Sequence, residues 1–234
     1  MAKKINKILI AGASSDIGVE LTKKLLKLNY EVIGIYNNHA AQLHKLKLSY
    51  KKLKIYKINF EFDEINNYNF EKIDCYLSLQ GYLSNTNIKK FNEDELIKHI
   101  KINFIKNLII INKILPHMKK NKFGKIFLTS SVGTKFGGSE NTLYYSISKF
   151  LNEFHPSYLR KLIMKNISIN TLMIGLVDTK LHNKIISKDL KKRINLTPAK
   201  RLISIAEISS TIADLIINED NIISNEVIKV TNGE

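Results

Sequence analysis

The chain has 234 residues, 44% of them hydrophobic, which is enough to bury a sizeable core and too many for a disordered chain. Its longest apolar runs, such as residues 108–111, exclude a membrane span, and the single cysteine, Cys75, excludes an intrachain disulfide and favours a core role in a reducing cytoplasm. The net charge of +16 comes mainly from lysines spread along the chain, so we expect a solvated basic surface and no nucleic-acid partner.

Predicted strands and helices alternate along the chain. Strands are predicted at residues 7–11, 31–36, 53–58, 75–79, 125–130, 168–173 and 226–230. Helices are predicted at residues 17–28, 40–48, 93–119, 144–165 and 206–218, with an irregular lysine-rich stretch before the last one. Short strands alternating with helices predict a doubly wound α/β fold, with a parallel sheet of about seven strands covered on both faces. No linker interrupts this order, so we expect one domain over residues 1–234, with ligands beyond the carboxyl ends of the strands.

The first predicted strand ends in a small-residue turn, AGASSDIG at residues 11–18, which opens the first helix. Backbone in such a turn can approach a pyrophosphate, and the helix N-terminus offers free N–H groups and the positive end of its dipole. The segment therefore predicts a dinucleotide-binding turn. An ordinary strand–helix turn with Ser14 or Asp16 as the N-cap is the alternative.

The strongest catalytic signal is the pair Tyr145 and Lys149, four residues apart on one face of a predicted helix. An ammonium beside a phenol stabilises the phenolate and lowers the phenol pKa from its usual value of roughly 10. The pair therefore predicts a general acid that works near neutral pH. Upstream, at the end of the strand 125–130, Ser131 is placed to polarise a substrate carbonyl, with Ser130 as the fallback.

In these motifs and in their order, the chain resembles the short-chain dehydrogenase/reductase family. The resemblance covers nearly the whole chain, including residues 197–207 and 226–233, and implies a Rossmann-type sheet and hydride transfer between a nicotinamide and a carbonyl or alcohol carbon. It implies that Tyr145 donates the proton and that Lys149 lowers the Tyr145 pKa and holds the nicotinamide ribose. It further implies that Ser131 polarises the carbonyl and that Asn103, inside the helix 93–119, supports a proton relay.

The resemblance also implies cofactor contacts at the ends of the strands. The expected contacts are Gly12, Ser14, Ser15, Asp16, Ile17, Gly18, Tyr36, Asn37, Asn59, Gly81, Tyr145, Lys149, Gly175, Val177 and Thr179. The chain departs from the family pattern at three of these turns. Asp16 stands in the place of a glycine, only Gly81 remains of the usual Asn-Asn-Ala-Gly, and Ile174 replaces a proline.

The end of the second predicted strand bears on the choice of cofactor. It reads YNNH at residues 36–39, without the acid that would bind the ribose hydroxyls of NAD. This favours NADP(H) over NAD(H). No arginine lies nearby, so Ser14, Asn37 and His39 would have to hold the additional phosphate.

We therefore expect an NAD(P)H-dependent oxidoreductase, most similar to reductases of 3-oxoacyl thioesters carried by an acyl carrier protein. A sugar or polyol dehydrogenase is the alternative. A non-catalytic dinucleotide-binding regulator is a further alternative; Asp16 and the altered residues 78–81 favour it, and the intact catalytic residues disfavour it. Residues 180–197 are predicted to form a variable lid over the substrate. Its cations, and Lys119, Lys120 and Lys122, would suit an anionic substrate or an acidic carrier, or would simply be solvated.

We also expect a homo-oligomer, a dimer or a tetramer, formed through the two long predicted helices. In the second of these helices, Phe150, Leu151, Phe154 and Leu159 form an apolar series that would serve such a contact or the core. The sequence begins without a signal-peptide pattern, so we expect a cytoplasmic protein that uses neither a membrane nor a metal.

Overall fold

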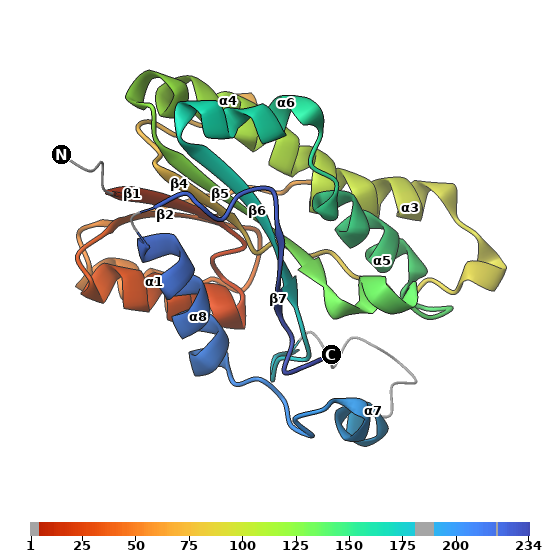
Figure 1. The fold of residues 1–234 in the computed structure, drawn as a ribbon. Helices are drawn as coiled ribbons and strands as arrows, with labels where there is room; N and C mark the ends of the chain where they lie inside the picture. Colours follow the sequence, from red (N-terminus) through yellow and green to blue (C-terminus); the bar gives the residue numbers. More distant parts are fainter. Residues whose placement is uncertain (1–4, 181–189, 219) are drawn as a thin grey trace.

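A computed structural model describes residues 5–180, 190–218 and 220–234 and builds them around one parallel sheet (Figure 1). The strands are β1 Lys7–Ala11, β2 Glu31–Tyr36, β3 Leu53–Lys57, β4 Cys75–Ser78, β5 Gly124–Ser131, β6 Ile167–Ile174 and β7 Val227–Val230. Their order across the sheet is β3-β2-β1-β4-β5-β6-β7, and every pairing is parallel. The chain winds outward from β1 to β3 and then returns to place β4 against β1. This reversal is the point at which such sheets bind ligands.

Helices cover both faces of the sheet, as predicted (Figure 1). One face carries α1 Asp16–Lys27, α2 Ala41–Ser49 and α8 Ile205–Ile217. The other carries α3 Glu93–Ile100, a π-helical turn Lys101–Ile105, α4 Lys106–Asn121, α5 Leu143–Phe150 and α6 Ser157–Arg160. Short 3₁₀ turns lie at Ile65–Asn67, Ile88–Lys90, Val132–Phe136, Leu151–Glu153 and Lys161–Lys165.

Alternate side chains of the strands divide the core into two layers. Ile8 and Ile10 of β1 pack with α1 and α8, whereas Leu9 and Ala11 pack with α4 on the opposite face. This is the pattern that a sheet buried on both sides requires. Cys75 lies fully buried in the first layer, which confirms its predicted role in the core.

The prediction of one continuous helix over residues 144–165 is wrong, although parts of it are helical. Helix α5 ends at Phe150, the turn Leu151–Glu153 follows, and Phe154 is extended before Pro156. Proline removes a backbone donor and disfavours a helical residue before it, so the helix restarts only at α6. The first long helix is interrupted too, by the π turn at residues 101–105, which joins α3 directly to α4.

The predicted irregular stretch before the last helix contains a further short helix, α7 Leu190–Leu196. Residues 181–189 of the predicted lid lie outside the described residues. No helix in the described part of the chain is long and apolar enough to cross a membrane.

Candidate active site

The turn after β1 requires glycine at its first position. Gly12 has a φ of +80°, and a Cβ there would lie 2.6 Å from the backbone nitrogen of Gln80. The N-cap of α1 is Ser15, rather than Ser14 or Asp16. Its Oγ accepts from the Gly18 N–H over 3.0 Å and donates to the Gly12 carbonyl over 2.8 Å. The turn and the helix N-terminus thus form the cradle that a pyrophosphate needs.

The carboxylate of Asp16 is engaged by the segment that follows β6. Its Oδ2 accepts from the backbone N–H of Lys180 over 3.0 Å. This contact connects the first turn of α1 with the residue after Thr179, one of the predicted cofactor contacts. Asp16, which stands where the family has a glycine, therefore has a hydrogen-bond partner within the protein. Ser14 makes a similar link toward the end of β2, because its hydroxyl donates to the carbonyl of Asn38.

The ends of β2 and β3 form the side of the site where we expect the adenosine. Tyr36 bonds His44 through its hydroxyl over 3.2 Å, and Asn37 is exposed. Asn59 accepts from the N–H of Glu61 through its side chain and donates its own N–H to Asp63. Sequence reasoning passed over Asp63, whose carboxylate closes the turn that carries Asn59.

Gly81 lies against the predicted catalytic pair. A Cβ at this position would be 3.8 Å from Cε2 of Tyr145 and 3.9 Å from Cε of Lys149. The ammonium of Lys149 donates to the Gln80 carbonyl over 2.9 Å and to Oγ1 of Thr129 over 3.0 Å. The structure thus brings together the ends of β4 and β5 and the helix α5, as the sequence predicted.

Burial sets the pKa values of this pair. It lowers the pKa of Lys149 to about 7 and raises the pKa of Tyr145 to about 12. The sequence predicted a lowered pKa for the Tyr145 phenol, but in the structure burial raises this pKa. The Lys149 Nζ lies 5.9 Å from the centre of the Tyr145 ring. A phenol with a raised pKa keeps its proton throughout the neutral range, so Tyr145 is available as a proton donor.

The two serines at the end of β5 have different partners. The hydroxyl of Ser130 donates to the carboxylate of Glu153, whereas Oγ of Ser131 accepts from the N–H of Gly133 over 3.2 Å. Because Ser131 is an acceptor in that bond, its own proton remains available for a substrate oxygen. The hydrogen bonds therefore favour Ser131 over the fallback Ser130.

Asn103 is fully buried in the π turn, and its side chain bonds residues of two other segments. Its side chain accepts from the N–H of Tyr82 over 2.7 Å and donates to the Tyr82 carbonyl and to Oγ of Ser148, each over 2.9 Å. Ser148 in turn donates to the carbonyl of Tyr145 over 2.8 Å. Asn103 thus joins the segment after β4 to the helix of Tyr145.

The carbonyl of Asn103 is held by two residues that sequence reasoning missed. The side-chain amides of Asn107 and Asn152 donate to it over 2.9 and 3.0 Å. Asn107 also accepts from the hydroxyl of Tyr76 over 2.7 Å and from the side-chain amide of Gln80. One indication of the role of Asn107 was present in the sequence: it is a polar residue on an apolar face of the predicted helix, four residues after Asn103.

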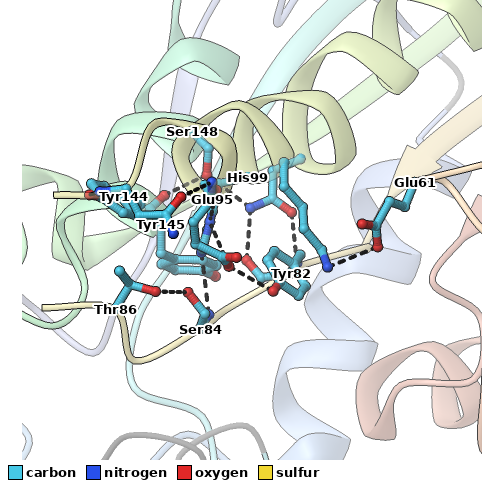
Figure 2. Close-up of polar contacts among 12 residues, drawn as sticks. Glu61, Tyr82, Ser84, Thr86, Glu95, His99, Tyr144, Tyr145 and Ser148 are labelled. Atoms are coloured by element: carbon cyan, nitrogen blue, oxygen red, sulfur yellow. Dashed lines mark hydrogen bonds and ion pairs between the residues drawn. The ribbon is translucent and has the colours of Figure 1, made fainter. Parts of the chain in front are cut away.

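A second missed group holds the loop after β4 against α3 (Figure 2). The Tyr82 hydroxyl donates to Glu95 over 2.7 Å, and Nδ1 of His99 donates to the Glu95 carbonyl over 2.8 Å. The Ser84 N–H donates to Nε2 of His99 over 3.3 Å. Burial lowers the pKa of His99, so its ring is neutral and Nε2 can accept. The spacing of Glu95 and His99, one helical turn apart, was the only signal.

The segment after β6 completes the described site. A Cβ on Gly175 would lie 2.6 Å from Cα of Thr231, so this turn also requires glycine. Val177 is buried and pairs with Ile203, and Thr179 is half-buried beside Lys180.

The predicted cationic lid is only partly open to a ligand. In α7, Arg193 forms an ion pair with the buried Glu234 at 2.7 Å, and its guanidinium carbon lies 5.1 Å from the centre of the Phe136 ring. The guanidinium of Arg193 thus already has partners within the protein, whereas the Lys191 side chain is exposed. Lys184 and Lys188 lie outside the described residues.

Lys119, Lys120 and Lys122 do not face the catalytic centre. They lie at the end of α4, just before β5 begins at Gly124, whereas Ser131 lies at the other end of that strand. These lysines therefore stand at the amino ends of the strands, at the opposite end of β5 from Ser131.

The chain also matches known proteins along nearly its whole length. The family model for the short chain dehydrogenases matches residues 6–190. A 3-oxoacyl-[acyl-carrier-protein] reductase of Buchnera aphidicola is 27% identical over 237 residues, covering 96% of this chain and 95% of the relative.

Two solved structures share the fold. The structure of ElxO with NADP bound has a TM-score of 0.82 and 21% identity, covering 98% of each chain. The structure of 4-hydroxyisoleucine dehydrogenase complexed with NADH has a TM-score of 0.83 and 21% identity, covering 97% of this chain and 98% of the other. With the glycine turn, the helix N-terminus and the Tyr145–Lys149 pair in place, the chain belongs to the short-chain dehydrogenase/reductase family and is an NAD(P)-dependent oxidoreductase.

Proposed function

We propose that the protein is a carbonyl reductase that prefers NADPH and reduces a 3-oxoacyl thioester. The observation that carries the reaction class is the position of Tyr145 and Lys149 beside Gly81, just after β4. Lys149 also donates to Thr129 in β5, the strand that ends at Ser131. The substrate class rests on the similarity to the 3-oxoacyl reductase of Buchnera over 96% of the chain.

In the proposed mechanism the nicotinamide dinucleotide supplies the hydride, and the protein supplies orientation and the proton. Ser131 donates a hydrogen bond to the carbonyl oxygen, where negative charge develops. Tyr145 transfers its phenolic proton to the same oxygen. Lys149 would hold the nicotinamide ribose of a bound cofactor and would support the phenolate that remains, and Asn103 holds the surrounding backbone in place.

Residues at the ends of the strands would hold the cofactor. The turn at Gly12 and the N-terminus of α1 suit the pyrophosphate, and Asn59 suits the adenine. The end of β2 presents Asn37 and no acid, which supports NADPH over NADH. The other expected contacts are Ser14, Ser15, Asp16, Ile17, Gly18, Tyr36, Gly81, Gly175, Val177 and Thr179.

We further propose that the protein is cytoplasmic and that copies of it associate through the end of α5 and the turn that follows it. Phe150 and Phe154 are 58% and 67% exposed there, whereas Leu159, from the same predicted series, is buried in the core. Exposed aromatic side chains of this kind are typical of protein contacts.

The test is oxidation of NADPH with acetoacetyl-CoA, run beside NADH, a panel of sugars and polyols, and the Tyr145→Phe variant. Turnover with the thioester that prefers NADPH and falls at least about a hundredfold in the variant supports the proposal. Turnover only with polyols would favour the sugar dehydrogenase alternative. Dinucleotide binding without turnover of any substrate would favour a regulator.

A further inference from the structure

The geometry points to Glu153 as a positioning residue that fixes Ser131 relative to Tyr145. This inference rests on the proposed function, because it assigns Ser131 and Tyr145 to one substrate oxygen. Glu153 itself does not touch the reacting atoms. It acts through the two hydroxyl residues that flank the catalytic serine.

Glu153 ends the 3₁₀ turn Leu151–Glu153 that continues α5. One oxygen of its carboxylate, Oε1, accepts from the hydroxyl of Ser130 and, over 2.7 Å, from the hydroxyl of Thr134. Both donors belong to the β5 side of the site, whereas the acceptor belongs to the helix of Tyr145 and Lys149. A single carboxylate oxygen thus bridges the two elements that supply the proposed catalytic groups.

The two donors enclose Ser131 in the chain. Ser130 precedes it, and Thr134 follows within the turn Val132–Phe136, where the Thr134 hydroxyl also lies 2.8 Å from the carbonyl of Ser131. The N–H of Gly133 bonds Oγ of Ser131 from the same turn. These local bonds fix the shape of the turn, and Glu153 fixes its place against α5.

The end of β5 has a particular need for such a contact. Pairing of β5 with β4 ends at Phe127, whereas pairing with β6 continues to Ser131. On its β4 side, the last part of the strand therefore relies on side-chain contacts. Ser130 is only 3% exposed, so its hydroxyl needs a partner inside the protein.

The consequence concerns catalysis more than folding. Ser131 and Tyr145 must both reach one oxygen, and a misplacement of about 1 Å can reduce a rate by roughly a hundredfold. Since both donors use the same oxygen of Glu153, a glutamine amide oxygen can replace it. The negative charge itself is not required.

The test compares Glu153→Leu with Glu153→Gln, using Glu71→Leu as the matched control on an exposed loop. We expect Glu153→Leu to lower kcat by roughly 10- to 100-fold while the Kd for NADPH, from fluorescence titration, stays within about twofold. Glu153→Gln should recover kcat to within about threefold of wild type, and Glu71→Leu should leave it unchanged. Wild-type kcat in folded Glu153→Leu, or no recovery in Glu153→Gln, would overturn the inference.

Crystal structures of the two variants separate this inference from the proposed function. Oγ of Ser131 displaced by about 1 Å in Glu153→Leu and in place in Glu153→Gln would support the inference even if wild type reduced no substrate tested. An unmoved Ser131 in Glu153→Leu would overturn it. If Glu153→Leu does not fold, the single variant Ser130→Ala removes one of the two bonds to Glu153 from the other side, leaves the Thr134 contact with the Ser131 carbonyl intact, and is subject to the same criteria.

Discussion

The ammonium of Lys149 donates to the backbone carbonyl of Gln80 over 2.9 Å, deep in the protein. The Gln80 side chain is itself fixed, because it accepts from Ser78 over 3.0 Å and donates to Asn107. The position of the proposed catalytic lysine thus depends on a polar cluster that connects the end of β4 with α4. This cluster occupies the place where the family usually has Asn-Asn-Ala-Gly.

The lowered pKa of Lys149 predicts a stability effect with a definite sign. Burial lowers its pKa to about 7, whereas a lysine in the unfolded chain titrates at roughly 10.4. Below about pH 7 the folded protein must keep a charge in its interior, which lowers the free energy of unfolding. Between about pH 7 and 10 the unfolded state binds more protons, so this penalty fades as the pH rises.

The variant Lys149→Met removes that penalty. The difference in Tm between Lys149→Met and wild type should therefore shift in favour of wild type as the pH rises from about 6 to about 9. Thermal unfolding across this range measures it, with the exposed Lys191→Met as the control. A difference that stays constant with pH would contradict the assigned pKa.

The buried hydrogen bonds of the Asn107 side chain predict a large loss of stability when this residue is substituted. In Asn107→Leu, the Tyr76 hydroxyl, the Gln80 amide and the Asn103 carbonyl all lose a buried partner. Leaving buried polar groups unpaired should lower the free energy of unfolding by about 3 kcal/mol. Urea denaturation checks the value, and Asn195→Leu on the exposed side of α7 should change it little. If both variants lowered the free energy of unfolding equally, the role assigned to the Asn107 hydrogen bonds would be wrong.

The sequence predicted the order and type of all seven strands because each is a short apolar segment bounded by polar residues or turns. It failed at residues 151–165 because apolar residues such as Leu151, Leu159 and Leu162 continue a helical spacing across Pro156. One proline, with the extended Phe154 before it, outweighs that spacing. Helix α7 was missed because its lysine-rich segment has no clear apolar stripe.

The proposed catalytic pair could be found from local spacing, but its supporting residues could not. Tyr145 and Lys149 are four residues apart, so the helix alone brings them to one face. Glu153, in contrast, meets Ser130 from 23 residues away, and Asn152 meets the carbonyl of Asn103 from 49 residues away. Such partners become visible only once the strands and helices are assembled. For the same reason, the choice between Ser130 and Ser131 as the residue that polarises the carbonyl required the hydrogen-bond partners of each hydroxyl.

The cofactor preference can be tested at the end of β2. Asn37 is exposed there, and Asn37→Asp places a carboxylate where a ribose phosphate would lie. The KM for NADPH should rise on the order of tenfold from like-charge repulsion, while the KM for NADH stays the same or falls. Steady-state kinetics with both cofactors measure the ratio. Asn195→Asp is the control for added negative charge elsewhere, and an equal change for both cofactors would argue against a phosphate at this position.

The two exposed aromatic residues at the end of α5 and after the next turn predict the association of two or more copies. Phe150 and Phe154 lie exposed on either side of the turn that ends in Glu153, so a neighbouring copy there would also cover the segment that supports Ser131. Light scattering at micromolar concentration should give a multiple of the chain mass for wild type. The double variant Phe150→Asp, Phe154→Asp should give the single-chain mass, because buried charges without partners oppose association. A reduced kcat in the dissociated variant, with NADPH affinity unchanged, would connect the contact to the placement of Ser131. A monomeric wild type would exclude both the contact and that connection.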